Sequence, residues 1–253
     1  MPRTLTGPLG GVRAGSQSSQ SSRPLQPSRS VSRATRLLPA GCLVAGPLFL
    51  GAGIAQGIAR DGFDFTRHAI SQLALGGPGW IQTVNFLLAG ALLGAGAIGL
   101  RRVLRGGAGT GAGTGAGTGV GAGAGPGATW GPVLIGVFGA SFLAAAAFPA
   151  DAGAGFPAGA PDAASLSAHG AAHMIGGMVG YLALCAALLV LARPLAVRGH
   201  RGWAVASRLV PLGVLAGFAG SAATVLAFTA GAGLSLVWLA AVTARLLADA
   251  ADD

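Results

Sequence analysis

DGFDFTRHAISQLALGGPGW, residues 61–80, is the one long stretch outside the tails that is dense in polar side chains of mixed chemistry. An apolar run of about 20 residues flanks it on each side, at 37–59 and 81–100, and each run is long enough to cross a bilayer as a helix. The stretch therefore predicts a polar loop between two membrane spans, and the rest of the chain repeats this arrangement.

The composition of the whole chain is typical of a membrane protein. Of its 253 residues 52% are hydrophobic and only 9% are charged, and the mean hydropathy is +0.66. Soluble domains carry about 25% charged residues, so this chain lacks the surface that water would solvate. An all-α bundle of about six transmembrane helices is predicted, and its four further apolar runs lie at 129–148, 169–192, 209–230 and 233–247.

The positions of the positive charges predict how the chain is oriented. The net charge is +9, and all 16 basic residues are arginines. Except for Arg60 and Arg67, they lie in the N-terminal tail, in the segments after the second and fourth apolar runs, or near the C-terminus. The positive-inside rule therefore predicts a cell-membrane protein with both termini in the cytoplasm and with loops 60–80 and 149–168 outside. Since the arginines mark the ends of apolar runs, no nucleic-acid partner is expected.

Two low-complexity segments and a short tail complete the predicted organisation. Residues 1–36 are rich in Ser, Gln, Pro, Gly and Arg and indicate a disordered basic tail. Residues 106–127 alternate glycine with alanine and threonine, without the Lys-Ser/Thr ending of a phosphate-binding loop, and indicate a flexible cytoplasmic tether. The tether interrupts a membrane domain predicted over 37–248, and 249–253 is expected to form a short acidic tail.

Pairs of glycines spaced four residues apart predict places where neighbouring helices approach closely. They are Gly53 with Gly57, Gly90 with Gly94, and Gly176 with Gly180. The two cysteines, Cys42 and Cys185, also fall inside predicted spans, where a free thiol packs as a small apolar group. Neither a disulfide framework nor a zinc pattern follows from them.

The first group of candidate site residues lies in the stretch 61–80. A short amphipathic helix is predicted over 65–75, on which residues four apart share a face, as Arg67 does with Ser71. A plain interfacial connector, whose charges face water and headgroups, is the alternative interpretation. The group consists of Asp61, Asp64, Arg67, His68, Ser71 and Gln72.

The second group lies on the other external loop and on the helix that follows it. Asp151 and Asp162 belong to the loop. His169 and His173 stand four residues apart and so share a face at the outer end of the fourth span. This spacing suits a metal ion, and an interhelical hydrogen bond explains it as well. Asn85, one turn into the second span, extends the candidate site inward.

Because both groups are expected outside and at similar depth, we interpret them as halves of one external site. The leading hypothesis is that this site binds a lipid or small ligand without catalysis, since no established catalytic motif occurs. One alternative is a metal-dependent intramembrane hydrolase, with Asp64 or Asp151 orienting a ligand or activating water. Its zinc ligands would be His68, His169 and His173. The other alternative is a structural or assembly partner of another membrane protein.

A set of short motifs links these residues to a known family. They are HAISQLALGGPGWIQ at 68–82, Asn85-Phe86 after it, the loop Asp151…Gly155-Phe156-Pro157…Gly159, and the helix start His169…His173. The chain resembles the uncharacterised bacterial membrane family called domain of unknown function 998, over residues 38–247 without the tether. The resemblance implies an integral membrane protein with the same six helices and with no established activity.

Overall fold

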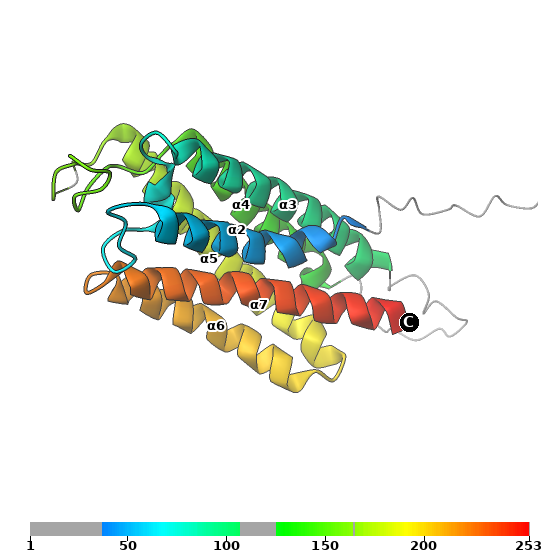
Figure 1. The fold of residues 1–253 in the computed structure, drawn as a ribbon. Helices are drawn as coiled ribbons and strands as arrows, with labels where there is room; N and C mark the ends of the chain where they lie inside the picture. The colour runs from blue at the N-terminus through cyan, green and yellow to red at the C-terminus, as the bar shows by residue number, and fades with distance from the viewer. Residues whose placement is uncertain (1–36, 107–124, 164, 253) are drawn as a thin grey trace, which may run out of the picture. The chain divides into compact units, whose positions relative to one another are not determined.

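A computed structural model describes residues 37–106, 125–163 and 165–252. Within them six α-helices are long and apolar enough to cross a membrane, which confirms the expected all-α, multi-pass architecture (Figure 1). The expected tail at 1–36 and most of the expected tether lie outside the described residues. The helices are α2 (Ala40–Ala59), α3 (Gly79–Gly106), α4 (Pro126–Ala147), α5 (Ala168–Val197), α6 (Arg201–Gly220) and α7 (Val225–Asp252), with a 3₁₀ helix, η1 (Ile70–Ala74), before α3.

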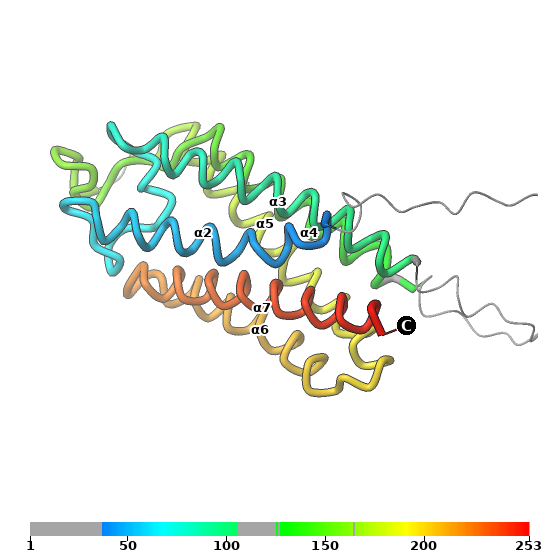
Figure 2. The backbone as a smooth tube through the Cα atoms, turned by 45° about the vertical axis from the view of Figure 1, so that its right-hand side comes forward, coloured from blue at the N-terminus to red at the C-terminus, as the bar shows by residue number. Residues whose placement is uncertain are grey.

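The helices form a bundle in which each packs against the next along the chain, and α2 completes it by packing against α7. Successive helices run in opposite directions, so their connections alternate between the two ends of the bundle (Figure 2). With an even number of helices, the described chain begins and ends at the same end (Figure 1). We call the opposite end, which carries segments 60–78 and 148–167, the loop end.

Small residues allow some of these helices to approach closely. Gly180 of α5 lies against Ser141 of α4, where a Cβ atom would collide with the serine side chain. This agrees with the close approach predicted from the glycine spacing. The pair at 53 and 57 has a different role, because Gly57 lies against the ring of Phe65 and so receives the loop rather than a helix.

The boundary between the last two helices differs from the sequence prediction. The turn between α6 and α7, at 221–224, falls inside the span expected at 209–230, so that expectation was wrong. Small polar side chains make the turn: the Ser221 hydroxyl donates to the Phe218 carbonyl (2.6 Å), and the Thr224 hydroxyl accepts from an α7 amide (3.3 Å). Four small residues scarcely change the hydropathy pattern, which is why the pattern missed them.

The last helix is also longer than expected. It runs over Val225–Asp252 rather than 233–247, and its 28 residues are ample for a bilayer. The acidic tail expected at 249–253 is, as far as it is described, the last turn of this helix. There the Asp249 carboxylate accepts a hydrogen bond from Arg245 one turn earlier (2.5 Å), a pairing that supports the helix.

Candidate functional site

The two polar loops of the loop end contact each other directly. The Arg67 guanidinium lies 3.7 Å from the Asp162 carboxylate at the exposed surface, where such a pair contributes about 0–1 kcal/mol. The Gln72 side-chain amide donates to the backbone oxygen of Asp151 (3.4 Å). Residues that the sequence carries in separate loops are therefore joined in the fold.

His68 is the buried link between the loops, with only 2% of its surface exposed. Its Nδ1 accepts a hydrogen bond from the Asp64 amide (2.9 Å), and its Nε2 lies 3.0 Å from the carbonyl oxygen of Ala154. Because a carbonyl only accepts, Nε2 carries the proton and the neutral ring uses both nitrogens. The ring packs beside those of Phe63 and Phe156. In this arrangement His68 has no nitrogen left for a metal ion.

The segment 65–75 is not the amphipathic α-helix that the sequence predicts. Only Ile70–Ala74 is helical, as a 3₁₀ helix, so residues four apart do not share a face. Asp64 favours a turn instead, because its carboxylate accepts hydrogen bonds from the Thr66 hydroxyl (2.7 Å) and amide (2.8 Å). These two bonds hold the pKa of Asp64 below its usual value. Asp61 is exposed to solvent nearby.

Arg60 was not among the candidate residues, yet it anchors the same loop. Its guanidinium donates to the carbonyl oxygens of Leu73 (2.6 Å) and Leu75 and lies 5.0 Å above the ring of Phe156. Partial burial lowers the pKa of this guanidinium. The sequence signal for this structural role was the position of Arg60, because the loops expected outside the membrane carry few other positive charges.

Asp151 holds Ser167, the N-cap residue of α5, in place. Its carboxylate accepts hydrogen bonds from the Ser167 hydroxyl (2.5 Å) and amide (2.9 Å), and that hydroxyl accepts in turn from the Gly170 amide (3.0 Å). The bonds from Ser167 hold the pKa of Asp151 below its usual value. A Cβ atom at position 170 would collide with the Asp151 carboxylate, so the cap requires glycine there.

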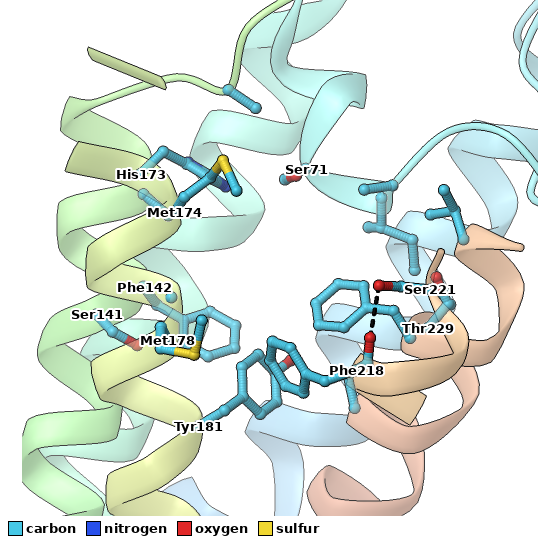
Figure 3. A pocket seen from close by; sticks show the side chains of 18 of the residues that line it. Ser71, Ser141, Phe142, His173, Met174, Met178, Tyr181, Phe218, Ser221 and Thr229 are labelled. Atoms are coloured by element: carbon cyan, nitrogen blue, oxygen red, sulfur yellow. Dashed lines mark hydrogen bonds between the residues drawn. The ribbon is translucent and has the colours of Figure 1, made fainter. Parts of the chain in front are cut away.

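A cavity of about 850 Å³ lies on the membrane side of the joined loops, between α5 on one side and α6 and α7 on the other (Figure 3). Part of η1, Asp151 and the exposed Ser221 line it near the loop end. Deeper in the bundle, the Tyr181 ring lies 5.7 Å from that of Phe218 and 5.9 Å from that of Phe228. The cavity is therefore polar at its rim and aromatic inside.

The two candidate histidines of α5 have different surroundings. His173 lines the cavity, and its Nδ1 lies 2.9 Å from the carbonyl oxygen of Phe148 at the end of α4. That nitrogen carries the proton in the neutral ring, so Nε2 is an acceptor. His169 is exposed, with its ring 5.8 Å from that of Phe148. Ser71 and Gln72 line the cavity as well, and Figure 3 shows Ser71 and His173 near its upper edge.

The zinc hypothesis gains no support from this geometry. In the part of the chain that the structure describes, no group of three or more His, Cys, Asp or Glu side chains could hold a metal ion. The hypothesis needs His68, His169 and His173 to converge. Instead, His68 uses both nitrogens between the loops, and of the other two only His173 lines the cavity.

Asn85 belongs to a separate polar cluster between α2 and α3. Its side-chain amide donates to the Phe49 carbonyl (3.1 Å) and to the Gln82 side-chain oxygen (3.2 Å). The same oxygen accepts from Gln56 (2.8 Å). Such hydrogen bonds hold membrane helices together, so Asn85 joins α2 to α3 rather than lining the cavity.

Several residues that line the cavity were not predicted. Tyr181, Phe218 and Thr229 lie in apolar spans, where a side chain that faces a cavity looks the same as one that faces lipid. The available signal was the tyrosine, the single one in the chain, because a phenol inside an apolar run needs a polar environment for its hydroxyl. The Thr229 hydroxyl is buried and has no hydrogen-bond partner among the described residues.

A bundle of six apolar helices with a polar-rimmed cavity between them defines a multi-pass membrane protein. The chain belongs to the family described as "Protein of unknown function (DUF998)", whose model matches residues 43–125 and 114–248. The two matches cover the helices on either side of the tether, which confirms the resemblance in the sequence motifs. Comparisons with curated proteins and with solved structures find no match.

Proposed function

We propose that the protein binds an amphiphilic small molecule, a lipid or a lipid-like compound, with its polar end at the rim of the cavity. The observation that carries the proposal is the composition of that rim. Ser71 and Gln72 come from one loop, Asp151 comes from the other, and His173 stands beside them on α5. Hydrogen bonds between the loops hold these groups together, so the polar end of a ligand meets a prearranged set of partners.

The size and lining of the cavity support a ligand of moderate length. Its volume of about 850 Å³ lies within the range of about 300–1,000 Å³ that is usual for small-molecule pockets. Such pockets are mostly apolar with a few placed polar groups, and this one has aromatic walls around Tyr181 and Phe142. An acyl or isoprenoid chain matches those walls.

The charge at the rim limits the polar end of the ligand. Among the cavity-lining residues, all within the described chain, Asp151 is the one with a carboxylate. Its pKa lies below the usual value because of the bonds from Ser167, so it stays ionised. A phosphate or carboxylate would be repelled, whereas a hydroxyl or amine donates to Nε2 of His173. We therefore expect a neutral or amine-bearing headgroup.

The distribution of the arginines supports an orientation for this site. With the arginine-rich segments and both termini in the cytoplasm, the loop end of the bundle faces outward from the cell membrane. The rim of the cavity then stands at the level of the outer-leaflet headgroups.

A plug variant tests the binding proposal. Gly177 lines the cavity, and a Cβ atom there meets no other atom, so Gly177→Phe extends into open space. Gly51 on α2 offers the same freedom without lining the cavity, so Gly51→Phe is the matched control. The probe is a monoacylglycerol with a diazirine in its acyl chain, added to purified protein in detergent, irradiated, and mapped by mass spectrometry of peptides.

Wild type and the control are expected to carry the label on peptides of α5, α6 and α7 around the cavity. Gly177→Phe is expected to lower this labelling by at least about tenfold, since the side chain occupies the space of the acyl chain. Labelling that is equal in the plug variant and the control, or that is spread over all lipid-facing helices, would refute the proposal.

A further inference from the structure

We infer that the cavity opens sideways into the bilayer between α5 and α6, and that its ligand is a lipid drawn from the surrounding leaflet through this opening. The inference rests on the proposed function, since it says where the bound amphiphile comes from. The side port, as we call the opening, is bordered by four residues that both line the cavity and are about half exposed or more: Met174, Met178, Leu182 and Leu215.

Among the helical side chains that line the cavity, the most exposed ones all lie on α5 and α6. On α5 and α6, Met178 is 50% exposed and Leu215 is 49% exposed. On the opposite walls, Phe49 of α2 is 6% exposed and Leu236 of α7 only 1%. Both sets line the same cavity, so the cavity surface alone does not account for the difference. The additional exposure of α5 and α6 is exposure to the outside of the bundle.

The exposed border lies at a depth where the outside is hydrocarbon. At 1.5 Å per residue, Met178 stands about 15 Å and Leu182 about 21 Å along α5 from its first residue, Ala168. The hydrocarbon core of a bilayer is about 30 Å thick, and α5 extends beyond it because it has 30 residues. The port therefore faces acyl chains of the leaflet at the loop end.

The connection of α5 and α6 explains why a gap forms on this side. Their short link at 198–200 holds the two helices together at the far end of the bundle, away from the loops. Towards the loop end, Figure 3 shows Met174 and Met178 on α5 facing Phe218 and Ser221 across the cavity. The flexible thioethers of methionine adapt to chains of different shape, which suits a border that a lipid must pass.

The side port also removes a difficulty for an apolar ligand. An acyl chain that reached the cavity through the polar rim would have to leave the bilayer and cross water, at about 0.8 kcal/mol for each methylene. A chain that slides between α5 and α6 stays in apolar surroundings throughout. Its headgroup moves along the membrane surface to Ser71 and His173, at the same end of the bundle.

Narrowing the port tests the inference. Leu182→Trp and Leu215→Trp each place a larger side chain at the border, and Val179→Trp and Leu212→Trp are controls on the lipid-facing surface of the same helices. The diazirine monoacylglycerol is added to nanodiscs that hold each protein, and labelling of the cavity peptides is followed against time before irradiation. The occupancy of the cavity by the probe at equilibrium in detergent is measured in parallel.

Both port variants are expected to slow labelling in nanodiscs by at least about tenfold, while both controls keep the wild-type rate. Each nanodisc rate is taken relative to the same protein's occupancy at equilibrium in detergent, because a tryptophan at these cavity-lining positions also takes up space inside the cavity. If the probe labels the cavity peptides of the port variants in nanodiscs as fast as those of the controls, the side port is overturned and the binding proposal remains intact. If wild type is labelled in neither medium, the binding proposal fails first.

A cysteine measurement keeps the inference testable if a tryptophan variant does not fold. In a chain with alanine at the two native cysteine positions, Met178→Cys is exposed to a lipid-borne maleimide or to a charged, membrane-impermeant thiol reagent. The references are Val179→Cys on the lipid-facing surface and Ser221→Cys at the exposed turn. Position 178 is expected to react like 179. A reaction pattern like that of 221 would show access from water and would overturn the side port.

Discussion

The imidazole Nε2 of His68 lies 3.0 Å from the backbone oxygen of Ala154, 86 residues further along the chain. The same loop also reaches the other side of the cavity, because the backbone oxygen of Thr66 accepts hydrogen bonds from the Val225 amide (3.0 Å) and the Thr224 hydroxyl (3.1 Å). Segment 60–78 thus contacts both the 148–167 loop and the α6–α7 turn, and it holds the rim together.

Replacement of His68 by alanine is expected to lower the free energy of unfolding by about 2–4 kcal/mol, because it removes a buried, packed ring and leaves the Asp64 amide and the Ala154 carbonyl without their partner. Thermal unfolding of the purified protein measures the loss. His169→Ala changes an exposed ring and is expected to stay within about 0.5 kcal/mol of wild type. Equal effects of the two substitutions would contradict the structural role of His68.

Two glycines of α5 should respond to alanine in opposite directions. Gly170→Ala is expected to destabilise the protein by about 1–3 kcal/mol, because the new methyl group collides with the Asp151 carboxylate that binds the N-cap residue Ser167. Gly177→Ala meets no atom and should stabilise the helix by up to about 1 kcal/mol, since alanine favours helix more than glycine does. A comparison of melting temperatures checks the pair, and a stabilising Gly170→Ala would refute the cap geometry.

Acid should weaken the loop end through Asp64 and Asp151. The pKa of each carboxyl is lowered in the folded protein by hydrogen bonds, from Thr66 and Ser167 respectively. Their stabilisation is therefore complete above the unfolded value of about 4 and is lost as the pH falls through the lower folded values.

The melting temperature of wild type is thus expected to drop as the pH goes below about 4, and Asp151→Asn should show a smaller drop because one titrating cap is gone. Asp61→Asn, at an exposed carboxyl, serves as the control. An Asp151→Asn variant with the full wild-type drop would show that the Asp151 cap does not contribute.

Headgroup charge should decide which amphiphiles occupy the cavity. With the same acyl chain, a monoacylglycerol is expected to bind at least about tenfold more tightly than its phosphate-bearing analogue, because Asp151 is ionised at the rim. Competition of each compound against the diazirine probe in detergent measures the ratio. Tighter binding of the phosphate compound would contradict the expected charge preference.

The sequence predicted more of the fold than of the site. Apolar runs separated by polar segments were sufficient for six helices, because a backbone in hydrocarbon must satisfy its hydrogen bonds within each helix. The same reasoning failed at the turn 221–224, where Ser221 and Thr224 close a connection without a polar loop. Within the site, residue type alone did not distinguish His68 from His173. Both ring nitrogens of His68 form hydrogen bonds between the loops, whereas His173 lines the cavity.

What the sequence by itself determined is therefore what depends on local composition: the location in a membrane, the helical class, and the two polar loops that carry the candidate residues. Only the tertiary structure decided which of them share a cavity. The reason is geometric, because Ser71 comes from η1, Asp151 from the loop before α5, and His173 and Tyr181 from α5, and their proximity depends on how these segments pack together. The segment 61–80 forms one rim with the loop before α5 because His68 and Gln72 contact the backbone of that loop.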